Sequence, residues 1–250
     1  MKITLPDNSS RELPEGSSGY DLAKDIGPGL AKSAIAVTIN GVQRDLHDAI
    51  DADASVSIIT IDSDEGVEIM RHTLTAQVLA RAIKNLYPKS KLAIGPTVQD
   101  GFYYDVESEE SISSDDLSKI EEEMKKIIKT KSAITKKLVS KKEALKIFKS
   151  NKEPYKEIII NESDQDDNFQ LYYQDDEEFV DLCRGPHLPN LGFIGSFKLT
   201  KVSGAYWKGD SKNSMLTRIY GTAFNNDKDL QNHLDNIEEA LKRDHRKLGK

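Results

Sequence analysis

Apolar runs and turn residues alternate over the first 61 residues. Four runs rich in apolar or β-branched residues predict strands: residues 2–5, 10–13, 34–39 and 56–61. Ser18 precedes a stretch of helical spacing that we expect to end before Gly27, and Asn40-Gly41 favours a tight turn after the third run. This pattern predicts a small α+β unit in which one helix crosses a mixed sheet.

A larger α+β unit is predicted over residues 62–225. Residues 62–66 are polar and are expected to form a linker, and apolar positions then follow helical spacing until Pro88. A second helix is predicted by the spacing of Leu117, Ile120, Met124 and Ile127. The remaining apolar runs predict strands: residues 92–96, 101–106, 171–173, 196–199 and 216–220.

Residues 226–250 predict one long terminal helix. Its apolar residues form a single stripe at 4-3-4 spacing, namely Leu230, Leu234, Ile237 and Leu241. The rest of the helix is charged, so the stripe is expected to dock on another surface, and we expect the helix to connect to a domain that this chain does not contain. The three segments give domain boundaries of 1–61, 62–225 and 226–250.

Composition narrows the class of protein. Hydrophobic residues make up 37% and charged residues 31%, which is typical of a globular chain, and no apolar run approaches the roughly 20 residues of a membrane span. A single cysteine excludes an internal disulfide and favours a reducing compartment, the cytoplasm. The net charge of -7 argues against nonspecific coating of nucleic acid, although residues 125–152 are rich in lysine. That lysine run fits either a solvated helix face or an RNA contact.

The sharpest local motif is Cys183-Arg184-Gly185-Pro186-His187. Gly-Pro bends the chain, so the thiol and the imidazole can face one another across a turn. The pair fits a nucleophile and its base, two metal ligands, a polar clamp around a water, or a structural role for both residues. Asp181, two residues earlier, would lie on the same strand face as Cys183 and is a candidate to orient a histidine or accept a proton.

Two further features carry candidate chemistry. His72 stands near the start of the predicted helix, where a solvated or capping histidine is common, and gains interest only if the fold brings it to Cys183. Residues 202–210 contain the only tryptophan, two glycines and a lysine–aspartate pair. This segment fits a turn pinned by an aromatic anchor or a loop that holds a nucleotide.

Taken together, these blocks resemble bacterial-type threonyl-tRNA synthetases. The matching segments, in order, read RHT at 71–73, AQVL at 76–79, AIGP at 93–96, GFYYD at 101–105, DLCRGPH at 181–187, GAYWKGD at 204–210, LTRIYGT at 216–222 and KRDHRKLGK at 242–250. The resemblance therefore covers essentially the whole chain.

The resemblance implies a fold and an activity. It implies an α+β chain with a ubiquitin-like β-grasp (TGS) domain, then the editing domain shared with alanyl-tRNA synthetases, then a linker helix. The implied reaction is hydrolysis of serine mischarged onto tRNA(Thr), with the tRNA acceptor end as partner. A second site is needed because one methyl group gives only about 10–200-fold discrimination in a binding pocket. ATP, magnesium, zinc and the homodimer contact are implied only for the catalytic core that is absent here, and this chain itself is expected to hold no cofactor.

The resemblance also assigns site residues. The catalytic candidates are His72, Cys183, His187, Asp181 and Lys156. The substrate-binding candidates are Gln77, Gly95, Tyr104 and Arg184. Zinc bound by His72, Cys183 and His187 is a less favoured alternative.

One departure from the family pattern concerns the helix start. Family editing sites pair two histidines four residues apart, whereas Gln77 stands in the second position here, five residues after His72. This spacing implies one inserted residue near Thr73 or Leu74. Glutamine cannot act as a base near neutral pH, so we expect weakened editing in which His187 is the more dependable titrating group. The alternatives are a tRNA-binding module that has lost its activity and a structural protein with no RNA partner.

Overall fold

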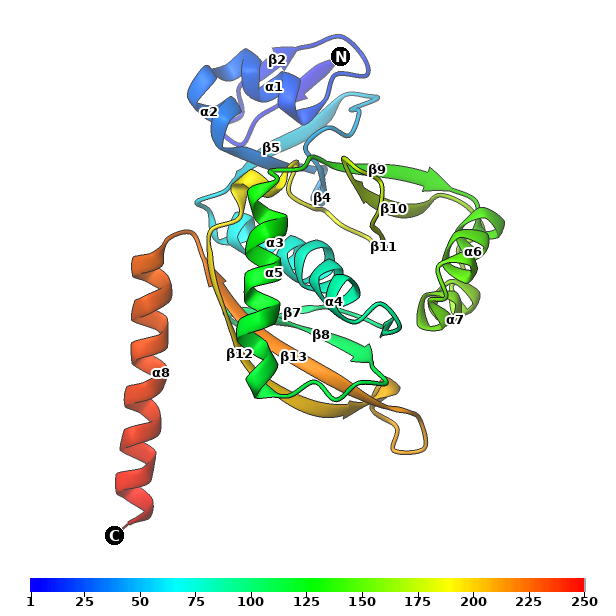
Figure 1. Cartoon of the computed structure of the whole chain (residues 1–250). Coiled ribbons are helices and arrows are strands. Elements are labelled where there is room, and N and C mark those ends of the chain that lie inside the picture. Colours follow the sequence, from blue (N-terminus) through cyan, green and yellow to red (C-terminus); the bar gives the residue numbers. More distant parts are fainter. Residues whose placement is uncertain (250) are drawn as a thin grey trace.

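A β-grasp unit, a layered α+β unit and a long terminal helix follow one another along the chain. The computed structural model describes residues 1–249. In Figure 1 the β-grasp unit lies at the top, the α+β unit below it, and the terminal helix extends away from both. The predicted α+β fold class is confirmed.

The amino-terminal sheet is mixed, with strand order β2-β1-β5-β3-β4 and a parallel β1–β5 pair. Its elements are β1 (Lys2–Thr4), β2 (Ser10–Glu12), α1 (Gly19–Ile26), α2 (Pro28–Ser33), β3 (Ala34–Ile39), β4 (Val42–Asp45) and β5 (Ala54–Thr60). Ser18 caps α1 in a reciprocal capping box with Asp21. Helix α1 ends at Ile26, so the prediction that it stops before Gly27 is confirmed. A second helix then begins at Pro28, because proline's fixed φ angle suits the first turn of a helix.

The predicted linker at residues 62–66 is wrong. Helix α3 (Asp64–Thr73) begins inside it, because the Ser63 hydroxyl accepts a hydrogen bond from the Gly66 N–H at 3.0 Å. Gly66 also packs against the end of the first unit, since a Cβ atom there would lie 1.9 Å from the Thr60 carbonyl oxygen. The two units are thus joined by a close contact.

The helix that follows changes geometry part-way. Helix α3 continues into a π-helix (Leu74–Leu79) and then into α4 (Ala80–Leu86). A π-helical turn holds one residue more than an α-helical turn, so this segment accommodates the inserted residue that the family pattern implied.

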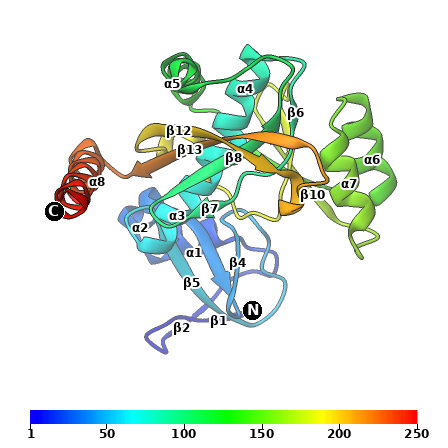
Figure 2. The ribbon, with the colours of Figure 1, turned by 90° about the horizontal axis from the view of Figure 1, so that it is seen from below.

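The main sheet of the second unit has the order β12-β13-β8-β6, with β7 paired to β8. Its elements are β6 (Lys91–Leu92), β7 (Thr97–Val98), β8 (Gly101–Glu107), a 3-10 turn (Ser114–Asp116), α5 (Leu117–Lys129), β12 (Ser196–Tyr206) and β13 (Met215–Phe224). Helices α3, α4 and α5 pack with this sheet around one core, and α5 buries the four apolar residues predicted for it. Figure 1 shows α3 and α4 between this sheet and the β-grasp unit, and Figure 2, seen from below, shows α8 (Asp227–Leu248) on the opposite side of the sheet from α6 (Lys141–Ser150) and α7 (Pro154–Glu162).

A smaller layer completes the second unit. A three-stranded antiparallel sheet of order β11-β10-β9 joins β9 (Ile134–Val139), β10 (Phe169–Gln174) and β11 (Val180–Leu182). Helices α6 (Lys141–Ser150) and α7 (Pro154–Glu162) lie at its end. Short 3-10 turns occur at Leu191–Phe193 and Trp207–Gly209. Trp207 packs against Tyr155 with ring centroids 4.8 Å apart, which favours the aromatic-anchor interpretation of that segment.

The terminal helix α8 (Asp227–Leu248) has no buried residue. Its predicted stripe stays partly or largely open, with Ile237 44% and Leu241 57% exposed. Figure 1 shows the helix running away from the sheet to the end of the chain.

Candidate functional site

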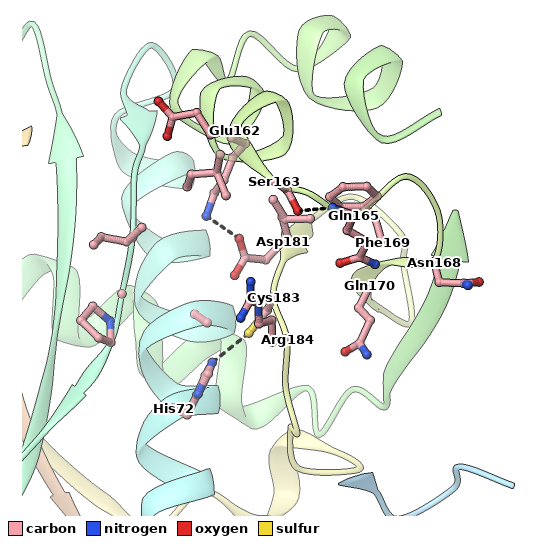
Figure 3. Close-up of a pocket in the computed structure, with 17 residues that line it drawn as sticks. His72, Glu162, Ser163, Gln165, Asn168, Phe169, Gln170, Asp181, Cys183 and Arg184 are labelled. Carbon is pink, nitrogen blue, oxygen red and sulfur yellow. Dashed lines mark hydrogen bonds and ion pairs between the residues drawn. The ribbon is translucent and has the colours of Figure 1, made fainter. Parts of the chain in front are cut away.

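A cavity of about 760 Å³ lies where α3, α7 and the segment after β11 meet. It falls within the roughly 300–1,000 Å³ range of small-molecule sites. In Figure 3, His72 on α3 and Cys183 after β11 point toward one another, and residues 162–170 form the opposite wall. The cavity thus brings together residues more than 100 positions apart in the sequence.

His72 and Cys183 form the central pair. The His72 Nε2 atom lies 2.9 Å from the Cys183 Sγ atom, and the Gly185 backbone N–H donates to the same sulfur at 3.3 Å. Burial raises the pKa of the Cys183 thiol to about 12, and the Asp181 charge adds to this. Cys183 is therefore a neutral thiol, which argues against a nucleophilic role and for a polar contact that holds the imidazole.

Asp181 pairs with Lys156. The Lys156 Nζ atom lies 2.9 Å from an Asp181 carboxylate oxygen, and both side chains are at most 5% exposed. Burial lowers the pKa of Lys156, but the Asp181 carboxylate outweighs burial and the net direction is upward. The structure thus gives Asp181 a buried lysine as its partner, where the sequence suggested a histidine.

His187 is fully buried behind His72, with ring centroids 4.7 Å apart. Its Nδ1 atom lies 3.0 Å from the Thr73 hydroxyl oxygen. The Thr73 hydroxyl donates its single hydrogen to the Ile69 carbonyl at 3.0 Å, so the imidazole Nδ1–H donates to the Thr73 oxygen. Burial and the nearby His72 hold the pKa of His187 well below its usual value. The prediction that His187 is the more dependable titrating group is wrong, because a buried imidazole stays neutral.

Stability is expected to fall as the pH is lowered from about 7 to 5. Burial lowers the pKa of both His72 and His187 in the folded chain, whereas unfolded histidine titrates near about 6.5. The unfolded chain therefore binds more protons below pH 6.5, and each histidine costs at most about 1.4 kcal/mol per pH unit. Urea unfolding at several pH values measures the slope.

Two variants test whether His187 contributes to the slope of stability against pH. His187→Asn should flatten the dependence, while His245→Asn on the exposed face of α8 should leave it unchanged. An identical slope in all three chains would contradict the assignment.

Gln77 does not line the cavity. Its side chain is fully buried, its Nε2 atom lies 3.5 Å from the Tyr172 carbonyl, and its Oε1 atom accepts from Gln174 at 3.2 Å. The residue four positions after His72 is Ala76, which does line the cavity. The extra residue of the π-helix thus leaves an alanine on the cavity wall and directs Gln77 into the core.

Of the other three substrate-binding candidates, two line the cavity and one lies behind its wall. Gly95 and the exposed Arg184 line the cavity. Tyr104 is fully buried instead and supports the wall from behind, since a Cβ atom on Gly95 would lie 2.2 Å from its ring. Glycine at position 95 therefore lets the cavity wall rest directly on the aromatic ring.

Sequence reasoning missed several residues of the site. The wall opposite His72 comes from residues for which no motif pointed to a ligand: Ile159, Glu162, Ser163, Gln165, Asn168, Phe169 and Gln170. Thr73, which holds His187, was noted as part of the RHT block and near the inserted residue, but not as a residue of the site. Its position directly after His72 could have indicated this role. A helix that brings His72 to Cys183 also brings Thr73 close to the 183–187 turn.

Three potential metal ligands meet at the site. One ligand atom each from His72, Cys183 and His187 lies within 4.8 Å of the others. The donor set fits a three-ligand zinc site in its residue types. Its geometry fits less well, because the His72 Nε2 and Cys183 Sγ atoms lie 2.9 Å apart, whereas a nitrogen and a sulfur bound to one tetrahedral zinc lie roughly 3.5 Å apart.

Comparisons with known proteins identify two domains and two relatives. Residues 1–60 match the TGS domain, and residues 170–220 match the threonyl and alanyl tRNA synthetase second additional domain. Over 248 residues, 99% of this chain, it is 50% identical to a threonine–tRNA ligase of Hahella chejuensis (strain KCTC 2396) and 48% identical to one of Prochlorococcus marinus (strain MIT 9211). By sequence, this chain belongs with the threonyl-tRNA synthetases. It spans 38% of the length of each of these two relatives.

The family match overlaps part of the cavity lining. The second additional domain match begins at Gln170 and runs through the 181–187 segment, so it covers one side of the cavity. No helix in the described part of this synthetase-family chain is both long and apolar enough to cross a membrane.

Proposed function

We propose that this chain hydrolyses the ester bond of serine mischarged onto tRNA(Thr). The observation that carries the proposal is the cavity itself, in which His72, held by Cys183, faces the buried Lys156–Asp181 pair inside an editing-type domain. A cavity of about 760 Å³ has room for an amino acid and part of the terminal nucleoside. We place this activity in the cytoplasm.

The proposed chemistry uses His72 as the base. Burial lowers the pKa of His72, so the imidazole is neutral near pH 7 and can take a proton from water. The water oxygen bonds to the ester carbonyl carbon, and the developing oxyanion is stabilised by the positive charge of Lys156. The carbon–oxygen bond to the ribose then breaks, the proton passes from His72 to the ribose oxygen, and free serine and tRNA leave. Crowding of the extra methyl group would exclude threonine.

The direct test is a deacylation assay with the 250-residue chain. Seryl-tRNA(Thr) should be hydrolysed faster than in buffer, while threonyl-tRNA(Thr) stays intact. A rate equal to that in buffer, measured on folded protein, would rule out the enzyme and leave a tRNA-binding module. That second candidate is favoured by one observation, the burial of Gln77 away from the cavity.

The salt dependence of tRNA binding distinguishes a tRNA-binding module from a protein with no RNA partner. A tRNA-binding module should lose affinity steeply as salt rises, because phosphate contacts release counterions. A protein with no RNA partner should show no such titration. In a longer protein we propose that these domains serve a threonine–tRNA ligase, whose ATP, magnesium, zinc and homodimer contact belong to the part this chain does not span.

A histidine at position 76 is expected to raise the hydrolysis rate. Ala76 lines the cavity four residues after His72, so Ala76→His places a second imidazole on the same face. General acid–base groups contribute about 10²–10⁴-fold, and we expect at least about a tenfold gain from an imperfectly placed one. Gln77→His is the matched control and should give no gain, because position 77 faces the core. A gain from Gln77→His alone would contradict the placement.

Metal removal is expected to leave activity unchanged. We propose a metal-free site, since the His72 Nε2 and Cys183 Sγ atoms lie at a hydrogen-bonding distance of 2.9 Å. Elemental analysis should find well under one zinc per chain, and dialysis against chelator should not lower the deacylation rate. Stoichiometric zinc whose removal abolishes activity would replace the metal-free mechanism with a zinc-bound hydroxide.

A further inference from the structure

The 183–187 turn is held from behind by the amino-terminal unit. Asp45, the last residue of β4, accepts the His187 backbone N–H through one carboxylate oxygen at 2.9 Å. Its other carboxylate oxygen accepts the Tyr172 hydroxyl at 2.8 Å. One side chain of the first unit therefore contacts two elements of the second, next to the proposed catalytic pair.

Tyr172 links Asp45 to the end and the middle of the turn. Its ring packs edge-on against the His187 ring with centroids 4.5 Å apart, and the residue is 2% exposed. In the middle of the turn, a Cβ atom on Gly185 would lie 2.1 Å from the Tyr172 hydroxyl. The turn thus wraps closely around a hydroxyl group whose position Asp45 sets.

A lysine completes this junction. The Lys136 Nζ atom lies 3.2 Å from Asp45 and 2.7 Å from Asp48. Both carboxylates are mostly buried, and a second cavity of about 300 Å³ is lined there by both units. Lys136 compensates both charges, but only Asp45 of the two aspartates contacts the turn.

Other contacts hold the turn elsewhere. Cys183 contacts His72 and the Gly185 N–H and its backbone N–H donates to the Gln170 carbonyl, while His187 contacts Thr73. Loss of the Asp45 contacts would release the His187 backbone N–H and leave the Tyr172 hydroxyl with Gln170 Oε1, 3.3 Å away. A misplacement of about 1 Å can cost roughly 10²-fold in rate, so a small movement of this turn matters.

We propose that Asp45 is a positioning residue of the hydrolytic cavity, so that the TGS unit forms part of the site's support. This inference rests on the proposed function. It gives the TGS unit a role in the hydrolysis that requires no contact with tRNA.

The test compares Asp45→Ala with Asp48→Ala in the full 250-residue chain. Both variants remove a carboxylate from Lys136, but only Asp45→Ala removes the contacts to the turn. We expect Asp45→Ala to lower kcat for seryl-tRNA(Thr) at least about tenfold with little change in KM. Asp48→Ala should keep the kcat of the unchanged chain.

A second readout does not depend on activity. Cys183 is the only cysteine, so the rate of maleimide labelling reports on this turn alone. Asp45→Ala should label several-fold faster than the unchanged chain, and Asp48→Ala at the same rate. Tyr172→Phe, which loses only the hydroxyl, should lie between them and serves if Asp45→Ala does not fold.

The two readouts separate the inference from the proposed function. Equal labelling rates and equal kcat in the unchanged chain and both Asp45→Ala and Tyr172→Phe would overturn the role of Asp45. Equal changes in Asp45→Ala and Asp48→Ala would also overturn it, because they would trace the effect to the domain junction as a whole. Absence of hydrolysis by the unchanged chain would sink the proposed function, while the labelling rates would still test Asp45.

Discussion

Replacing His72 with alanine is expected to lower the rate of seryl-tRNA(Thr) hydrolysis about 100-fold or more, or to the rate in buffer if that is reached first. General acid–base groups contribute about 10²–10⁴-fold, and His72 is the one imidazole that lines the described cavity. The fold should survive, because His72 is only half-buried and its partner Cys183 keeps the Gly185 N–H. The measurement is single-turnover deacylation, with thermal unfolding as the check on folding.

A conservative variant distinguishes a base from a simple hydrogen-bonding residue. His72→Gln can still contact Cys183 but cannot accept a proton near neutral pH. It should be as slow as His72→Ala. Full activity in His72→Gln would mean that the residue only orients the water, and the proposed base would be wrong.

Replacing Lys156 with methionine is expected to lower the free energy of unfolding by about 3–5 kcal/mol, the usual cost of leaving one member of a buried ion pair alone. Both side chains of the Lys156–Asp181 pair are at most 5% exposed, so solvent does little to screen the remaining carboxylate. Urea unfolding followed by circular dichroism measures the change. A loss below about 1 kcal/mol would show that another group or solvent compensates the Asp181 charge when Lys156 is absent.

The double variant Lys156→Met with Asp181→Leu is the matched control. Removing both charges should recover most of the lost stability, because apolar pairs of similar volume replace buried ion pairs at little cost. The same double variant should remain nearly inactive in deacylation if Lys156 stabilises the oxyanion. A stable and fully active double variant would confine the pair to a structural role.

Local sequence signals predicted most of the secondary structure. The Ser18 capping box and the apolar face of Leu117, Ile120, Met124 and Ile127 each depend on residues within four positions of one another. Such signals act over one helical turn, so they can be recognised without a tertiary structure. The linker prediction at residues 62–66 failed because a polar segment is typical both of a linker and of the first turn of a surface helix.

The sequence predicted individual residues of the site but not their arrangement. The segment from Asp181 to His187 carried His72's partner, and the family resemblance added Lys156 and Gly95. The resemblance could not place Gln77 relative to the cavity, because a single π-helical turn moves every later side chain around the helix axis. Ala76 took the cavity position for that reason. Tyr104 lies on β8, and its burial behind Gly95 depends on tertiary packing.

The sequence by itself determined two α+β units, the terminal helix and the residue types of the site, because local spacing and turn chemistry specify elements. The family resemblance assigned the first unit to the β-grasp fold. Only the tertiary structure decided that Asp181 pairs with Lys156, that His187 is buried and neutral, and that Asp45 holds the turn from another domain. These contacts join residues 25 to 142 positions apart, and burial and charge compensation at such separations depend on how the layers pack.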